Sequence, residues 1–303
     1  MTSPITILYR LFTIDLDLQS DKPVSRFLAA TLRGGFGYTL KRLVCSFRSS
    51  ECTQCLLKSK CIYPFLFETA PSPDAPRLRK YRTVPRPFAF RPYQNGDSVT
   101  VTLLLIGDAV GMLPFFIHAM NELGKRGLGK GRIPFTVQQV ATRSRDCVYR
   151  HDAPDACCEV QPENIMVQPG EARDGSVTLS FSTPLVMRKD GKILDEFLPE
   201  VFITTLLRRI TNLNAFFGST REIEIDPHPW IDAMRGLEVQ ADMRPVEQHR
   251  FSTRQKRSID YSGITGSVRL SGGVGTLMPL LKAGEILGVG KNTVFGFGEY
   301  VVA

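Results

Sequence analysis

The sequence contains no apolar run long enough to cross a membrane. Its longest apolar tract, about residues 99–120, is interrupted by Gly107 and Asp108 and again by Pro114. A spanning helix needs about 20 apolar residues in succession. A secretion signal is also missing, because residues 4–16 alternate between apolar and polar types and include Arg10 and Asp15. We therefore expect a soluble, cytoplasmic protein with no membrane partner.

Complete nucleotide-binding motifs are missing as well, although residues 284–303 are rich in glycine. A phosphate-binding G-x-x-x-x-G-K-[ST] loop that ends at Lys291 would need a glycine where Glu285 stands and a hydroxyl where Asn292 stands. The stretch also follows a helical pattern, whereas nucleotide loops precede a helix. Glycines still let backbone amides approach a ligand closely. Consecutive amides beside Lys291 therefore indicate an anion site, for example for the phosphate of a polymer.

Acidic residues are scarce in the first half of the chain. Residues 1–150 contain 22 Lys and Arg against 10 Asp and Glu, whereas residues 151–303 contain 16 against 20. Residues 77–91 carry six basic residues and no acid, interleaved with Tyr81, Phe88 and Phe90, and residues 244–257 carry five against one Glu. Cations neutralise phosphates and aromatic rings stack on bases. Two such runs favour a nucleic-acid partner over plain solvated loops.

Four of the seven cysteines lie together, in the spacing C-x6-C-x2-C-x5-C: Cys45, Cys52, Cys55 and Cys61. Without a secretion signal, four thiolates within one short loop favour a metal over disulfides. Tetrathiolate sites suit Zn²⁺ or an iron–sulfur cluster. We expect structural Zn²⁺, with an iron–sulfur cluster as the alternative, in an insertion that follows the first helix.

The two halves of the chain repeat one pattern of elements. The first half alternates as a strand over 4–17, a helix over about 22–44, a strand over 98–106, a helix over about 109–123 and a strand over 133–142. The second half gives a strand over 175–187, a helix over about 196–217, strand-like residues 239–251, a strand over 262–271, a helix over 275–287 and a terminal strand. The segments GLGKG and GVGKN echo each other after the second helix of each half.

This repeat predicts an α+β protein of two tandem ferredoxin-like (RRM-like) β-α-β-β-α-β domains. Residues 1–150 form the first domain, with a metal-binding insertion of four cysteines over 45–61 and a basic loop over 77–91. Residues 151–174 form a linker. Residues 175–303 form the second domain, with the glycine-rich loop over 288–298.

With these segments in order, the chain resembles the CRISPR-associated endoribonucleases of the RAMP superfamily, which process precursor CRISPR RNA. The resemblance rests on LRGGFGYTLKRLVC (32–45), LIGDAVGMLPFFIHAMNELGKRGLGKGRIPF (105–135), FSTPLVMRKDGKI (181–193), HRFSTRQKRSIDYSGITGSV (249–268) and the C-terminal glycine loop. It implies cleavage of CRISPR repeat RNA without a catalytic cofactor. The ribose 2′-OH attacks the adjacent phosphate and leaves a 2′,3′-cyclic phosphate and a 5′-OH.

The resemblance further implies that the protein stays bound to the processed crRNA and that other subunits of a CRISPR effector complex are further partners. The alternative is a non-catalytic crRNA-binding subunit of such a complex. The residues expected to bind RNA come from the two basic runs and the glycine loop: Arg79, Lys80, Arg82, Arg86, Ser252, Arg254, Lys256, Gly288, Gly290, Lys291, Asn292, Gly296 and Gly298.

Histidine is scarce, and this matters for the chemistry. Many relatives carry a catalytic histidine around the end of the first helix, but here no histidine precedes His118. His118 lies on an apolar helical stretch and is expected to pack in the core. Among the four histidines only His249 lies in a basic run, so it is the candidate general base or acid, beside Arg250. Tyr38, Lys41 and Arg42 on the first helix are the other candidates, and Lys41 and Arg42 can equally form a solvated face.

Overall fold

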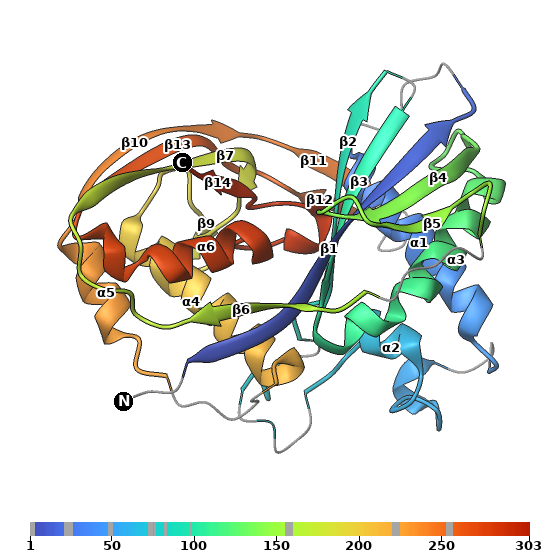
Figure 1. Cartoon of the computed structure of the whole chain (residues 1–303), viewed down its shortest axis with the longest axis horizontal. Coiled ribbons are helices and arrows are strands. Elements are labelled where there is room, and N and C mark those ends of the chain that lie inside the picture. The colour runs from blue at the N-terminus through green and yellow to red at the C-terminus, as the bar shows by residue number, and fades with distance from the viewer. Residues whose placement is uncertain are drawn as a thin grey trace. The chain divides into compact units, whose positions relative to one another are not determined.

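A computed structural model describes residues 4–20, 27–47, 51–71, 75, 77–81, 84–96, 98–154, 160–219, 225–252 and 257–303. By its internal contacts the chain divides into two compact units. We call Leu8–Asn164 the N-terminal unit. Ile165–Ala303 together with Met1–Ile7 is the C-terminal unit. Each unit is described by itself (Figure 1).

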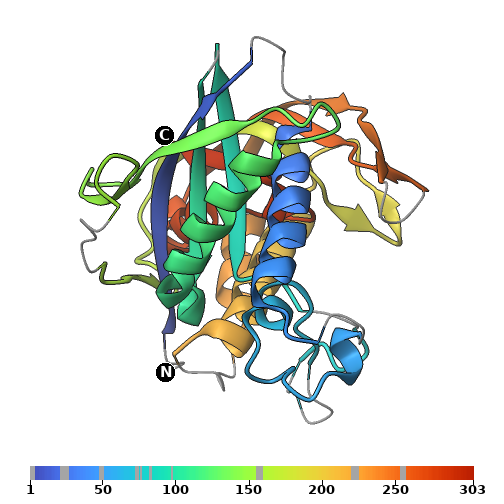
Figure 2. The same cartoon turned by 90° about the vertical axis from the view of Figure 1, so that its right-hand side faces the viewer.

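The N-terminal unit is built on an antiparallel sheet in the order β2-β3-β1-β4-β5. Its strands are β1 (Ile5–Leu18), β2 (Phe88–Asn95), β3 (Ser98–Ile106), β4 (Phe135–Thr142) and β5 (Cys147–Arg150). Its main helices are α1 (Leu28–Val44) and α3 (Leu113–Arg126), which lie side by side on one face of the sheet (Figure 2). The short helix α2 (Ile62–Phe67) lies between α1 and β2.

Alternating apolar residues position this sheet. Along the second half of β1 the side chains of Phe12, Ile14, Leu16 and Leu18 are buried and alternate with more open ones, so one strand face meets the helices. Phe36 of α1 is fully buried and stacks on Phe116 of α3, with ring centroids 4.7 Å apart. Such ring pairs add to the free energy gained from burial and fix the two helices against the sheet.

The C-terminal unit repeats this topology with the sheet order β10-β13-β7-β14. Its strands are β7 (Gly175–Leu185), β10 (Glu238–Val246), β13 (Gly263–Gly272) and β14 (Tyr300–Val302). Its helices are α4 (Pro199–Phe217), α5 (His228–Arg235) and α6 (Met278–Leu287). Two hairpins extend from it: β8 (Arg188–Lys189) with β9 (Lys192–Ile193), and β11 (His249–Ser252) with β12 (Arg257–Asp260).

The predicted fold class is confirmed. In each unit the first strand lies between the third and the fourth strands of a β-α-β-β-α-β unit, and the second strand lies at the edge beside the third. The glycine echo is structural too. Gly127 ends α3 with φ 84° and Gly288 ends α6 with φ 73°, and each is followed two residues later by another glycine of positive φ. Only glycine adopts these angles without strain, which explains the repeated spacing.

The interpretation of residues 77–91 as a basic loop is wrong at its C-terminal end. Phe88–Asn95 is strand β2, and Phe88 and Phe90 are buried. Their rings pack against Phe36, so they are core residues and cannot stack on bases. The strand was missed because its charged neighbours dominated the pattern, although apolar residues at 88 and 90 have the period of a strand.

Two smaller expectations also need correction. The stretch 151–174, predicted to be a linker, contains strand β6 (Glu163–Val167), in which Ile165 and Val167 are buried. His118 is exposed on α3 rather than packed in the core.

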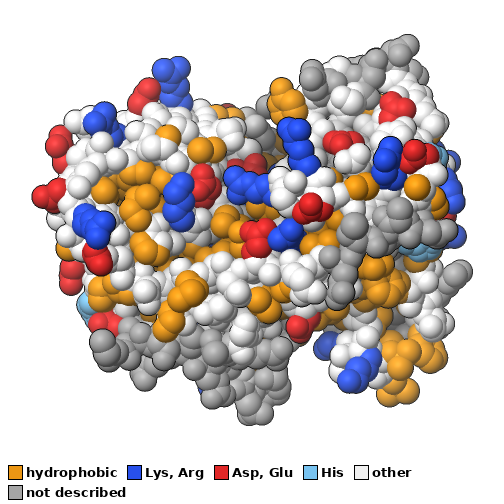
Figure 3. Space-filling view, in the orientation of Figure 1, with side chains coloured by type: hydrophobic (Ala, Val, Ile, Leu, Met, Phe, Trp, Pro, Cys, Tyr) orange, Lys and Arg blue, Asp and Glu red, His pale blue; other side chains and the backbone are white. Residues whose placement is uncertain are grey.

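None of the helices in the described part of the chain is long and apolar enough to span a membrane. On the face shown in Figure 3, the described Lys and Arg side chains are scattered among Asp and Glu and form no continuous basic surface.

Candidate RNA-binding and catalytic site

The glycine-rich loop is held to the end of β7 by its own backbone. The amide of Lys291 donates to Val186 O at 2.9 Å, that of Gly298 donates to Pro184 O at 3.0 Å, and that of Val289 donates to Gly298 O at 3.0 Å. The amides of Phe295 and Gly296 donate within the loop. These five amides are therefore not free to bind an anion, and the prediction of an amide cradle is wrong for them.

What the loop presents instead is the side chain of Lys291, which is exposed. Partial burial of the Lys291 side chain and the neighbouring charges of Arg188 and Arg208 hold the pKa of Lys291 below its usual value. Hydrogen bonds that involve the loop backbone and the end of α6 position the segments that carry the two arginines near Lys291. Arg188 follows Val186, the acceptor of the Lys291 amide, by two residues. Arg208 precedes Arg209, whose guanidinium donates two hydrogen bonds, of 2.9 and 2.6 Å, to Leu287 O at the end of α6.

Cations that lie close together repel one another, which costs free energy unless an anion binds between them. Arg188, Arg208 and Lys291 come from β8, α4 and the loop, and all three side chains are exposed. In the part of the chain that the structure describes, no ion pair is formed by any of the three. We call them the cation cluster. Its chemistry suits a phosphate group, which accepts hydrogen bonds from several cations at once.

The end of the β11–β12 hairpin lies near Arg188 of the cation cluster. His249 pairs across the strands with Asp260, and its Nδ1 lies 3.9 Å from Asp260 Oδ1. The Ser262 hydroxyl and amide, with smaller contributions from His249 and Arg188, hold the pKa of Asp260 below its usual value. Arg188 thus neighbours both Lys291 and the carboxylate beside His249.

An aromatic group fixes the hairpin to the glycine loop. Tyr261, at the end of the hairpin, is buried, and its ring centroid lies 5.7 Å from that of Phe295 and 5.3 Å from that of Phe297. The phenylalanines of the loop therefore serve packing. They bring the His249–Asp260 pair to the same part of the unit as the loop that carries Lys291.

The candidates on α1 are arranged differently. Tyr38 is 55% exposed, and Arg42 Nη1 donates to its hydroxyl at 3.3 Å. Lys41 is turned to the cysteine insertion, where its Nζ lies 5.2 Å from the ring centroid of Tyr63. Burial lowers the pKa of Lys41, but the neighbouring Cys52 and Tyr63 outweigh burial and the net shift is upward. The geometry favours a packing role for Lys41 and leaves Tyr38 and Arg42 open to a ligand.

The remaining RNA-binding candidates are placed only in part. Arg79 Nε donates to Ala75 O at 2.6 Å and Arg86 Nη1 donates to Val84 O at 3.3 Å, while Lys80 is exposed. Arg82, Arg254 and Lys256 lie outside the described residues. Arg250 and Ser252 lie in β11, but their side chains are outside the described part of the structure.

Comparisons with known proteins follow this division into two halves. Residues 179–300, which carry the cation cluster and the His249 hairpin, match the family described as CRISPR-associated endoribonuclease Cas6. Residues 7–162 match a family known as the AF_1859 N-terminal domain. The C-terminal half of the chain belongs to the Cas6 family. The protein is an endoribonuclease of the class that processes precursor CRISPR RNA.

Solved Cas6 structures share the fold over almost the whole length of this chain. A Cas6 (TTHB231) product complex matches with a TM-score of 0.57 at 18% identity, covering 97% of this chain and 100% of that chain. Thermus thermophilus Cas6 (TTHB231) alone matches with a TM-score of 0.52 at 15% identity, covering 100% of both. An uncharacterised protein of Archaeoglobus fulgidus is 27% identical over 291 residues, covering 90% of this chain and 91% of its own length.

The cysteine insertion of this chain can be tested for its fit to a metal. Cys52 is buried and Cys45, Cys55 and Cys61 are half-buried. Among the residues described, however, no group of three or more His, Cys, Asp or Glu side chains is arranged to hold a metal ion. The tetrathiolate centre therefore stays a prediction from the cysteine spacing.

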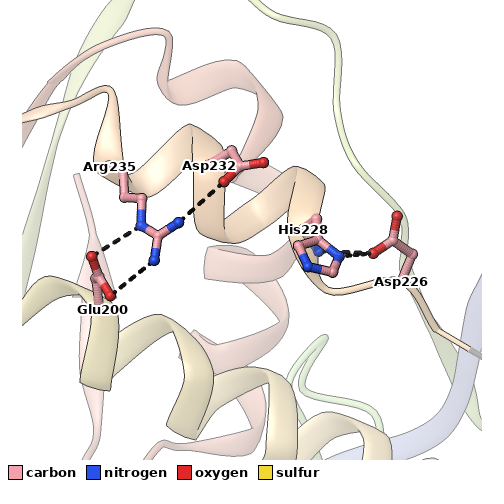
Figure 4. A network of polar contacts seen from close by, with 5 residues as sticks. All are labelled: Glu200, Asp226, His228, Asp232 and Arg235. Carbon is pink, nitrogen blue, oxygen red and sulfur yellow. Dashed lines mark hydrogen bonds and ion pairs between the residues drawn. The ribbon is translucent and has the colours of Figure 1, made fainter.

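One further histidine lies beside a carboxylate, outside the hairpin. His228 begins α5, and its Nδ1 lies 2.6 Å from Asp226 Oδ1 (Figure 4). In the same network Arg235 of α5 contacts both carboxylate oxygens of Glu200, at 3.0 and 3.3 Å. These contacts tie α5 to α4 and give His228 a local, structural partner.

Proposed function

We propose that this protein cleaves CRISPR repeat RNA at a site formed by the His249–Asp260 pair and the cation cluster of the C-terminal unit. The observation that supports this most is the electrostatic proximity of Lys291 to Arg188 and Arg208, together with the position of Arg188 near Asp260, the ionised cross-strand partner of His249. Three cations suit a phosphodiester, and histidine titrates near neutral pH, as a general base or acid requires.

The proposed reaction is an internal transesterification. The ribose 2′-OH loses its proton to a base, and a bond forms between its oxygen and the adjacent phosphorus. The bond from phosphorus to the 5′ oxygen of the next nucleotide breaks, and that oxygen takes up a proton. The products carry a 2′,3′-cyclic phosphate and a 5′-OH. His249 exchanges one of the two protons, and the cation cluster stabilises the extra negative charge on the phosphorane.

The partners follow from the family. The solved relatives include Cas6 product complexes and a Cas6-RT-Cas1–Cas2 complex. We propose that this chain likewise binds precursor CRISPR RNA, retains the crRNA product and docks with other CRISPR proteins. A non-catalytic crRNA-binding subunit is the second candidate, favoured by the lack of histidine before His118.

A single pair of RNAs separates the two candidates. In EDTA, the full-length protein is expected to cleave repeat RNA transcribed from the CRISPR arrays of the host genome, because no metal ion takes part in the proposed chemistry. The same RNA with a 2′-deoxyribose at the scissile position should bind equally well and stay intact. Product ends are read by phosphatase sensitivity and mass spectrometry. Tight binding of the all-ribose RNA without cleavage would select the non-catalytic subunit instead.

We also propose structural Zn²⁺ at Cys45, Cys52, Cys55 and Cys61, with an iron–sulfur cluster as the alternative; neither takes part in the reaction. Protein purified without oxygen is expected to hold about one metal atom per chain if zinc is bound. Cys55→Ser should lose most of it, and Cys147→Ser, which removes a thiol on β5, should keep it. Elemental analysis measures both. Metal-free protein that melts at the same temperature as protein refolded with zinc would contradict the prediction.

A further inference from the structure

A second group of cations surrounds Tyr38 in the N-terminal unit. The guanidinium carbon of Arg126, at the end of α3, lies 4.6 Å from the centroid of the Tyr38 ring. The guanidinium of Arg42, at the end of α1, lies 5.9 Å from the same centroid and donates to the phenol oxygen at 3.3 Å. Two guanidinium groups from different helices thus converge on one exposed phenol.

The packing of the two helices explains this convergence. A Cβ at Gly35 would lie 2.8 Å from Leu123 Cδ1, so the absence of a side chain lets α1 and α3 approach closely. Tyr38 follows Gly35 by one turn, and Arg126 follows Leu123 by one turn. A close contact made possible by glycine therefore brings together two side chains that are far apart in the chain.

The charges of this group are not balanced by acids in the described part of the chain. Neither Arg42 nor Arg126 forms an ion pair there, whereas Lys125, the neighbour of Arg126, is paired with Glu122 at 2.6 Å. Hydrogen bonding by Arg42 and then by Arg126 holds the pKa of the Tyr38 phenol below its usual value. The adjoining glycine turn adds the exposed cations Lys130 and Arg132.

We propose that Tyr38, Arg42 and Arg126 form a clamp for one backbone phosphate of the bound RNA, distinct from the scissile phosphate. The planar guanidinium groups supply paired donors that match phosphate oxygens, and the Tyr38 hydroxyl, which accepts from arginine without RNA, can turn and donate to the same phosphate. The clamp lacks a base that titrates near neutral pH, so it binds rather than cleaves. The proposal rests on the RNA-cleaving function proposed above.

The clamp can be tested through the salt dependence of RNA binding. The slope of log affinity against log salt counts the phosphates that protein cations neutralise, at about one per phosphate. Binding is measured with the 2′-deoxy repeat RNA for the wild-type protein, Arg42→Gln, Arg126→Gln, the double variant and Tyr38→Phe. Lys125→Gln is the matched control, because it removes the same charge from the same turn of α3. Single-turnover cleavage of the all-ribose RNA at saturating protein is measured in parallel.

Each single arginine variant is expected to bind about tenfold more weakly than wild type. The double variant should lower the slope by about one rather than two, because both groups hold the same phosphate. Tyr38→Phe should weaken binding about threefold without changing the slope.

Three results would overturn the clamp. A slope lowered by about two would mean separate contacts, and affinities equal to those of Lys125→Gln would mean no contact. A loss of cleavage rate of tenfold or more at unchanged affinity would place these side chains at the scissile bond. Wild-type protein that neither binds nor cleaves repeat RNA would instead refute the proposed function itself.

Discussion

His249→Ala is expected to slow single-turnover cleavage of repeat RNA by about two orders of magnitude or more, with only a modest change in affinity. The reason is the exchange of a proton in the transition state, which alanine cannot perform. Asp260 should keep the imidazole oriented as an ionised carboxylate, because Ser262 holds the pKa of Asp260 below its usual value.

The chain supplies a matched control for this experiment. His228 is also an exposed histidine beside a carboxylate, with an Nδ1–Oδ1 distance of 2.6 Å to Asp226 against 3.9 Å between His249 and Asp260. It lies on α5, in a network that ties this helix to α4. His228→Ala is therefore expected to cleave at the wild-type rate. Wild-type cleavage by His249→Ala would move the chemistry to the Tyr38, Lys41 and Arg42 group. It would also remove the support for the hairpin site.

Gly298→Ala is expected to lower the free energy of unfolding by about 3 kcal/mol or more. Gly298 has φ 66°, an angle that costs a residue with a side chain about 1–2 kcal/mol. A Cβ there would also lie 1.8 Å from Val289 O, so the backbone must move and the hydrogen bond from the Val289 amide to Gly298 O is lost or distorted. Thermal or denaturant unfolding of the full chain measures the loss.

Gly191→Ala separates the two causes. Gly191 lies in the β8–β9 turn with φ 81°, and a Cβ there would meet no atom within 4 Å. This variant should lose only the cost of the angle, about 1–2 kcal/mol. Equal losses in the two variants would show that the loop gives way easily. That result would contradict the inference that the loop backbone holds Lys291 rigidly in place.

Much of the fold was predictable because its signals are local. Alternation in residues 4–17 and 98–106 predicted β1 and β3 to within a residue or two at each end. Strand β2 was missed because a run of arginines directly precedes it. Charge is read from a window of residues, whereas the burial of Phe88 and Phe90 depends on Phe36 and Phe116, which lie far away in the sequence.

The candidate site was predictable only where one segment carried it. His249 and Lys291 stood out through their own neighbours in the chain. Arg188, Arg208 and Asp260 did not, because an isolated arginine on a hairpin or a helix has the same local pattern as a solvated one. Arg126 was missed for the same reason, and its relation to Tyr38 depends on the contact between Gly35 and Leu123.

The sequence by itself determined the two β-α-β-β-α-β halves and the positions of the glycine turns, because periodicity and the need for positive φ are properties of short segments. Only the tertiary structure decided what the glycine-rich loop offers to a ligand. Its amides could be counted in the sequence, but their hydrogen bonds to Pro184 and Val186 join segments that are about a hundred residues apart. A buried amide donates to whichever carbonyl the fold brings near it, so the side chain of Lys291, together with Arg188 and Arg208, is what remains for the phosphate.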